Sequence, residues 1–131
     1  MDICVDFDGT LVDHCYPEIG QPVPEAIKWL KKFQSYGARI ILYTMRSDNE
    51  KDGPILTQAV NYIKAAGVAL YGVNHNPAQD DWTKSPKAYA DLYIDDSAVG
   101  CPLVQIKGFT RPCVDWKKVG PYVENLLLFH R

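Results

Sequence analysis

The 131-residue sequence lacks the features that mark several common protein classes. Its four cysteines are widely spaced and form no CxxC pair, which argues against a zinc knuckle and favours a reducing, cytoplasmic compartment. No apolar run approaches the ~18 residues that a membrane span needs, and the charged, strand-like start does not resemble a signal peptide. The net charge of −2 gives no general attraction to nucleic acid or to an anionic membrane. The chain also lacks internal repeats and a GxxxxGK[ST] phosphate-binding loop.

What remains is the composition of an ordinary globular protein, with 47% apolar and 23% charged residues. At this length we expect one domain, residues 1–131, with a single hydrophobic core.

The first strand-like run ends in two carboxylates. Ile3-Cys4-Val5 is a short apolar run typical of a buried parallel strand, and Asp6 and Asp8 follow it at positions i and i+2. They share one face of an extended chain, or they converge from a loop if the pleat ends with the strand. In either case they repel each other unless a cation or a shared proton lies between them. A cation that prefers oxygen ligands, such as Mg2+, is the expected solution.

Strands and helices alternate along the rest of the chain. Apolar spacing and flanking prolines and glycines predict helices from Pro24 to Gly37, from Pro54 to Gly67 and from Pro121 to Phe129. Short apolar runs predict the strands Ile3–Val5, Arg39–Tyr43, Val68–Val73 and Leu92–Ile94, with Leu103–Ile106 as a fifth. The pattern indicates an α/β fold, a three-layer Rossmann-like, mostly parallel sheet with helices on both faces. Ligands bind such folds at the carboxyl ends of the strands.

Two further polar clusters follow predicted strands. Thr44 ends the second strand, where its hydroxyl and the amides after it suit a phosphate oxygen. Asp95 and Asp96 end the fourth strand, and such an acidic pair is uncommon unless a cation lies nearby. Each cluster taken alone also fits an ordinary surface loop.

A lysine upstream of the fourth strand supplies the opposite charge, which suits a transferring phosphoryl group. Lys87 is favoured because a helical turn from Pro86 to Ala90 would aim it back at the strand ends, and Lys84 is the alternative. Both lysines also fit the usual place of lysine, the solvated surface.

These clusters carry a family resemblance. Asp6-Phe7-Asp8-Gly9-Thr10 resembles the DxDGT first motif of the haloacid dehalogenase-like phosphatases. Thr44 after a hydrophobic strand is similar to the second motif, and Asp95-Asp96 is similar to the acidic fourth motif. The resemblance extends from Asp6 to Asp96 and implies a small hydrolase, a phosphatase, formed by one domain of this family.

The resemblance implies Mg2+-dependent hydrolysis of a phosphomonoester through an aspartyl-phosphate. Asp6 would be the nucleophile and Asp8 the general acid and base. The implied catalytic residues are Asp6, Asp8, Thr44 and Lys87. The implied Mg2+ ligands are Asp6, Asp8 through its backbone carbonyl, Asp96, and Asp95, either through water or as the residue that orients the lysine. The expected substrate contacts are Thr44, Met45, Arg46 and Lys84.

The spacing of the motifs bears on the substrate. The intervals from Thr10 to Thr44 and from Thr44 to Lys84 are too short to hold a folded cap domain, so we expect a capless, open site. Capless members of this family often act on bulky phosphorylated substrates, including nucleic-acid ends, so nucleic acid is expected only as a substrate. Loop residues that could contact it are His14, Tyr16, Arg46, His75 and Trp82.

Two alternatives stay open. The chain could be a phosphatase for a small metabolite or nucleotide that uses a homo-oligomer as its lid. It could also be a non-catalytic module that binds phosphate or protein, although both aspartates of the first motif are present.

Overall fold

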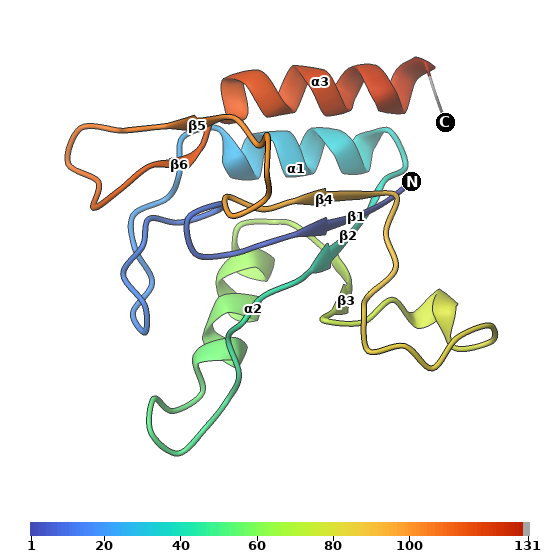
Figure 1. Cartoon of the computed structure of the whole chain (residues 1–131), viewed down its shortest axis with the longest axis horizontal. Helices are drawn as coiled ribbons and strands as arrows, with labels where there is room; N and C mark the ends of the chain where they lie inside the picture. The colour runs from blue at the N-terminus through green and yellow to red at the C-terminus, as the bar shows by residue number, and fades with distance from the viewer. Residues whose placement is uncertain (130–131) are drawn as a thin grey trace.

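A four-stranded parallel sheet forms the centre of the computed structural model, which describes residues 1–129 (Figure 1). The strands lie in the order β3-β2-β1-β4, and all three neighbouring pairs are parallel. They are β1 (Asp2–Val5), β2 (Arg39–Leu42), β3 (Leu70–Val73) and β4 (Leu92–Ile94). The predicted α/β class with a mostly parallel sheet flanked by helices is therefore confirmed, although the α-helices, predicted on both faces, lie on one face and an irregular segment covers the other.

Three helices pack on the side chains of one sheet face. They are α1 (Ala26–Ser35), α2 (Ile55–Ala65) and α3 (Trp116–Phe129). Side chains alternate along a strand, so Ile3 and Val5 of β1 reach the large core cluster that also contains buried residues of all three helices. Helix α3 lies along α1 (Figure 1), and the rings of Phe33 and Trp116 join them with centroids 6.3 Å apart. This packing fixes the strand ends that carry the site.

The opposite sheet face is covered by segment 74–91, which includes the short 3-10 helix η1 (Pro77–Gln79). Cys4 and Ile41 point to this side and form a small second cluster with Ala88 of the segment. The helical turn predicted from Pro86 to Ala90 is wrong, because the chain there is irregular. The Gln79 side chain takes the backbone bonds that such a turn would use, donating to the carbonyls of residues 85 and 87 and accepting from the amide of residue 89.

The C-terminal part differs from the prediction in two ways. The predicted fifth strand is the short β5 (Leu103–Val104), which pairs antiparallel with β6 (Cys113–Val114) outside the central sheet. Helix α3 begins at Trp116 rather than at Pro121, which lies inside it. The Asp115 side chain accepts a hydrogen bond from the Lys117 amide at this helix start, and Trp116 is buried. Tertiary packing thus outweighs the local proline signal.

The sequence predicts neither a cap domain nor a membrane-spanning segment, and both points concern how the elements of residues 1–129 are connected and how long they are. The interval between β1 and β2 holds a loop and α1, and the interval between β2 and β3 holds α2, so neither contains an inserted cap domain. None of the helices in this part of the chain is both long and apolar enough to cross a bilayer.

Candidate functional site

Three aspartates meet at the carboxyl ends of β1 and β4. Asp6 follows β1, Asp95 and Asp96 follow β4, and the two strands are neighbours in the sheet. One carboxylate oxygen from each residue lies within 4.8 Å of the other two. The sequence prediction that these three residues share one site is therefore met by the geometry, whereas the Asp8 carboxylate lies outside this group.

The three carboxylates form a strongly acidic site. The pKa of Asp6 is raised to about 8, mainly by burial and further by the negative charge of Asp95 and a hydrogen bond with Asp96. A hydrogen bond from the Phe7 backbone amide lowers it in part. A carboxyl group in such a position is ionised at neutral pH only when a cation offsets the surrounding charge. Carboxylate oxygens are the ligands that Mg2+ prefers. The donor set of Asp6, Asp95 and Asp96 thus fits a hard divalent cation.

Buried Thr10 connects Asp6 with Asp96. Its hydroxyl donates to Asp6 Oδ2 at 3.1 Å and accepts from the Asp96 amide at 3.2 Å. The C-terminal segment holds this loop in turn, because Trp116 Nε1 donates to the Thr10 carbonyl at 2.8 Å and the Val114 amide donates to the Gly9 carbonyl at 3.0 Å. Residues beyond the sequence resemblance therefore position the site.

His14 lies against Asp96, with its Nε2 3.4 Å from Asp96 Oδ2 and 3.3 Å from the Pro112 carbonyl. Arg111 Nη2 lies 2.9 Å from His14 Nδ1. Because a guanidinium only donates, Nδ1 is the acceptor and the ring proton resides on Nε2, facing Asp96. Gly9 packs against His14 and Asp96 and has a φ of 84°, and a Cβ at this position would collide with the His14 ring and with Asp96 Oδ2. Glycine is thus required here for both conformation and space.

Asp8 is held by Arg46 in a bidentate ion pair. Arg46 Nε donates to Asp8 Oδ2 and Nη2 donates to Asp8 Oδ1, both at 2.8 Å. The remaining donors of the guanidinium bind the carbonyls of Pro17, Glu18 and Ile55. The Arg46 side chain is fully buried and the Asp8 side chain is 19% exposed.

This geometry corrects the prediction that Arg46 contacts the substrate. Its guanidinium is enclosed and all its N–H groups are used, so it positions Asp8 and the loop around Pro17 instead. It also means that Asp8 must turn away from Arg46 before it can donate a proton to a leaving group.

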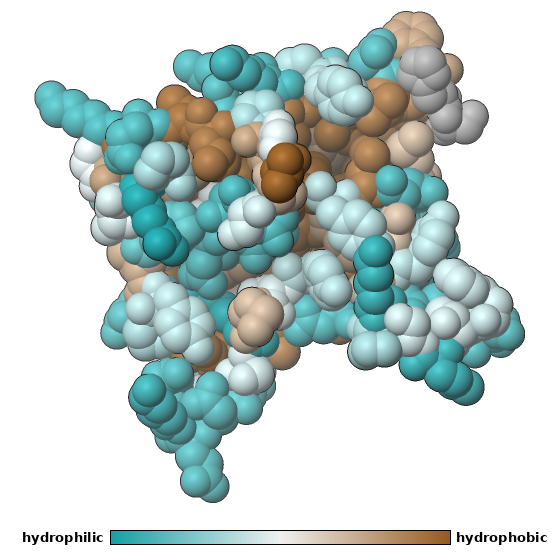
Figure 2. Space-filling view, in the orientation of Figure 1, coloured by the Kyte–Doolittle hydropathy of each residue, from teal (hydrophilic) through white to brown (hydrophobic). Residues whose placement is uncertain are grey.

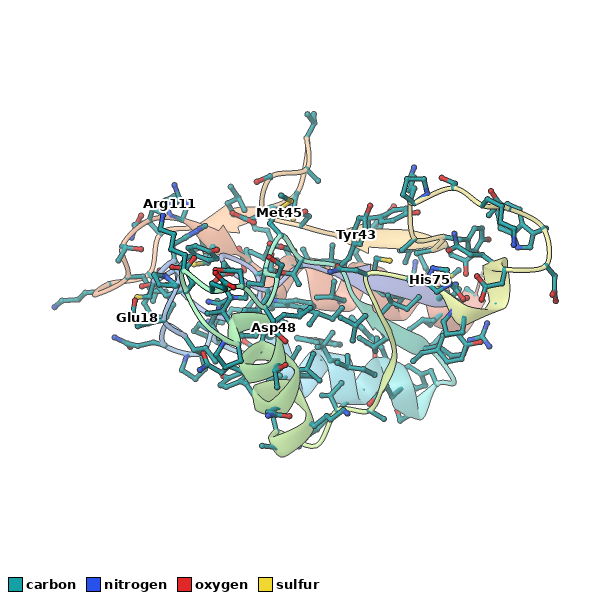
Figure 3. The ribbon with its side chains drawn as sticks, turned by 90° about the horizontal axis from the view of Figure 1, so that it is seen from below. Glu18, Tyr43, Met45, Asp48, His75 and Arg111 are labelled. Atoms are coloured by element: carbon teal, nitrogen blue, oxygen red, sulfur yellow. The ribbon has the colours of Figure 1, made fainter. Side chains whose placement is uncertain are left out.

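Thr44 lies on the other side of Asp6, after β2. Its amide donates to Asn74 Oδ1 at 2.8 Å, and its hydroxyl oxygen accepts from the Arg46 amide at 3.1 Å. The Thr44 hydroxyl proton and the Met45 amide have no acceptor among residues 1–129, so they are the donors left for a phosphate oxygen. Met45 itself is 94% exposed, and Figure 3 shows it with Tyr43 on the side of the sheet away from α1 and α2.

The two candidate lysines are exposed. Lys87 Nζ lies 5.3 Å from the centre of the Tyr93 ring, and neither lysine makes an ion pair within the described part of the chain. Lys87 therefore lies on the site's side of the sheet without contacting the carboxylates. His75 pairs with Asp80 at 2.8 Å, and it lies toward the end of the molecule opposite Arg111 (Figure 3).

Two hollows meet at Asp6. One of about 210 Å3 is lined by Cys4, Asp6, Tyr43, Tyr93, Ile94, Asp95, Ser97 and Ala98. The other, of about 270 Å3, is lined by Asp6, Tyr43, Thr44, Met45, Asn74, Pro86 and Asp95. Figure 2 views this face, where apolar surface gathers in the upper half of the view and the centre is mostly hydrophilic to neutral. The site is thus open along the sheet face.

Sequence reasoning missed three residues of this site. Asn74 at the end of β3 fixes Thr44, and Tyr43 and Tyr93 flank the hollow beside Asp6. Asn74 has φ 54°, and an asparagine directly after a strand is a signal for such a turn. For the tyrosines the signal was the two-residue period, which places Tyr93 on the same side as Asp95.

No protein-family model matches the chain, and no curated protein matches it. A solved structure is similar over almost the whole length, that of a conserved protein coded by a locus of Bacteroides thetaiotaomicron. The TM-score is 0.75 and the sequence identity is 32%, and the similarity covers 100% of this chain and 98% of that chain.

Proposed function

The chain belongs to the same family as this conserved Bacteroides thetaiotaomicron protein, and from the residues of its own site we propose that it is a Mg2+-dependent phosphatase of the haloacid dehalogenase-like type. The observation that carries the proposal is the junction of Asp6, Asp95 and Asp96 beside the donors of Thr44 and Met45 that have no acceptor among residues 1–129. A site for a transferring phosphoryl group needs a cation, which carboxylates can bind, and it needs N–H and O–H donors for the phosphoryl oxygens.

Asp6 is the proposed nucleophile. The Thr10 hydroxyl fixes one of its oxygens, Oδ2, and leaves the other to attack phosphorus. That attack forms an O–P bond and breaks the bond from phosphorus to the leaving oxygen, which takes up a proton. The Thr44 hydroxyl and the Met45 amide bind the phosphoryl oxygens during this step.

Asp8 is the proposed group for proton transfer. In the second step a water molecule attacks the phosphorus of the aspartyl-phosphate, the bond to Asp6 breaks, and inorganic phosphate leaves. In the first step the protonated carboxyl group of Asp8, turned out of the ion pair with Arg46, gives its proton to the leaving oxygen. The Asp8 carboxylate formed in that step takes the proton of the water in the second step, which restores the proton donor.

Mg2+ bound by Asp6, Asp95 and Asp96 would offset their charge and that of the phosphate oxygens. Lys87 is the proposed second cation, because the Pro86–Ala90 segment is exposed apart from Ala88 and the partly buried Ala90, and a lysine side chain is long and flexible. The absence of a cap in residues 1–129 leaves the site open to a bulky substrate.

The experiment is hydrolysis of an aryl phosphate with Mg2+, with chelator, and by Asp6→Asn. We expect turnover only with Mg2+, and none in Asp6→Asn, because the amide is neither a nucleophile nor a cation ligand of comparable strength. Asp81→Asn, the same change at an exposed aspartate of segment 74–91, is the matched control and should retain turnover. Turnover that survives Asp6→Asn or chelation would refute the proposal.

A further inference from the structure

The sheet face beside Asp6 carries an aromatic surface that the proposed chemistry does not use. Tyr43 directly follows β2 and Tyr93 lies in β4, the two neighbours of β1, and the ring centroids lie 6.1 Å apart with the planes tilted by 53°. Cys4 of β1 lies between them at the floor of the 210 Å3 hollow. Asp6, two residues after Cys4, lines the same hollow, so the aromatic rings lie next to the position proposed for the phosphate.

The two tyrosines differ in how they are held. Tyr93 is fixed by its hydroxyl, which donates to the Ala88 carbonyl at 2.8 Å and accepts from the Ala90 amide at 3.2 Å. The Tyr43 hydroxyl makes no hydrogen bond within residues 1–129, although its ring bounds both hollows. Tyr43 therefore offers a ring and a free polar group to a ligand, while Tyr93 gives the surface its rigid side.

The charge next to this surface is positive. Lys87 Nζ lies above the Tyr93 ring without an ion-pair partner in the described residues, while the far side of the hollow is acidic. A molecule that extends from Asp6 over the tyrosines thus passes from a phosphate site, for which Lys87 is the proposed second cation, to an aromatic surface. Base stacking on aromatic rings combined with a cation for the backbone is the usual way to hold a single-stranded nucleotide unit.

We propose that the Tyr43–Tyr93 surface binds the base of a phosphorylated nucleoside whose phosphate lies at Asp6. The inference rests on the proposed function, because that function places the phosphate. The nucleoside unit can come from a free nucleotide or from the phosphorylated end of a single strand, and both share this chemistry.

The test compares adenosine 5′-phosphate with ribose 5-phosphate, which has the same phosphate ester and sugar without the base. With Mg2+, we expect kcat/KM to be about 5- to 150-fold higher for the nucleotide, the range of one base–aromatic contact. In Tyr43→Leu the ratio of the two kcat/KM values should fall toward one. Tyr43→Phe retains the ring and should retain most of the ratio. The control Tyr122→Leu, at an exposed tyrosine of α3, should leave the ratio unchanged.

A binding measurement separates this inference from the proposed function. Equilibrium dialysis of adenosine 5′-phosphate and ribose 5-phosphate against Asp6→Asn reports the base contact without turnover. If no ester is hydrolysed, the proposed function fails, and tighter binding of the nucleotide that Tyr43→Leu abolishes still supports the aromatic surface. Equal kcat/KM and equal affinity for the two phosphates would overturn the inference.

A 5′-phosphorylated single-stranded oligonucleotide forms the last arm. A kcat/KM above that of the mononucleotide identifies a strand end as the source of the nucleoside unit, and a much lower value identifies the free nucleotide. The proposal is contradicted if neither the oligonucleotide nor the mononucleotide has a kcat/KM above that of ribose 5-phosphate.

Discussion

The ion pair of Arg46 with Asp8 gives the sharpest prediction about stability. Arg46 is fully buried, donates to both oxygens of Asp8, and binds the carbonyls of residues 17, 18 and 55. Arg46→Met keeps most of the apolar stem but removes every one of these donors. Asp8 then loses its partner, and the carbonyls of residues 17, 18 and 55 each lose a donor.

The expected loss follows from the burial of the pair. Removing one partner of a buried ion pair costs about 3–5 kcal/mol, and the 19% exposure of Asp8 places Arg46→Met near the lower end, about 3 kcal/mol. With a urea m-value of about 2 kcal/mol per M, the midpoint of urea unfolding should fall by about 1.5 M. Asp8→Ala should cost more, because it leaves the enclosed guanidinium without a counter-charge.

Arg39→Met is the matched control, since Arg39 also forms a two-point pair, with Asp2. The Arg39 side chain is 47% exposed, and Asp2, although only 10% exposed, keeps its hydrogen bond from Asn76 when Arg39 is removed. An exposed pair contributes about 0–1 kcal/mol, so this variant should shift the midpoint much less. Equal shifts for Arg39→Met and Arg46→Met, or a loss below 1 kcal/mol for Arg46→Met, would refute the reasoning.

Three further predictions concern the site. Gly9→Ala should weaken Mg2+ binding about 10- to 100-fold, measured by calorimetry, because the added Cβ displaces His14 and Asp96. The control Gly108→Ala, also at positive φ but in open space, should leave Mg2+ binding unchanged. The pKa of Asp6 is about 8 in the folded, metal-free protein and 3.8 in the unfolded chain, so the folded state binds the proton more tightly. The melting temperature should therefore fall as the pH rises from about 4 to 8, and Asp6→Asn should abolish that slope. Trp116→Phe should cost about 1 kcal/mol through the lost bond to the Thr10 carbonyl, visible as a lower unfolding midpoint; an unchanged midpoint would contradict this.

The central sheet was predictable because its strands are short apolar runs between turn residues. The boundaries of β4 coincide with the prediction, and those of the other strands differ by a few residues. Segment 86–90 and the start of α3 were not predictable, because side chains distant in sequence decide them. Gln79 takes the backbone bonds of the first, and the burial of Trp116 against Phe33 decides the second.

The site was predictable where strand order alone brings residues together. Asp6, Asp95 and Asp96 meet because β1 and β4 are neighbours. The partner of Arg46 could not be read from its neighbours in sequence, since Asp8 lies 38 positions away. The same holds for Asn74 and Thr44, which are 30 positions apart, and for the two tyrosines. The roles of Lys84 and Lys87 stay predictions.

The most direct measurement of the central claim is peptide mapping by mass spectrometry after rapid acid quenching of the protein with Mg2+ and an aryl phosphate. We expect one phosphoryl group on the peptide that contains Asp6, and none in Asp6→Asn under the same conditions. Turnover with no phosphoryl group on that peptide, or with a phosphoryl group on another residue, would contradict the role of Asp6 as the nucleophile.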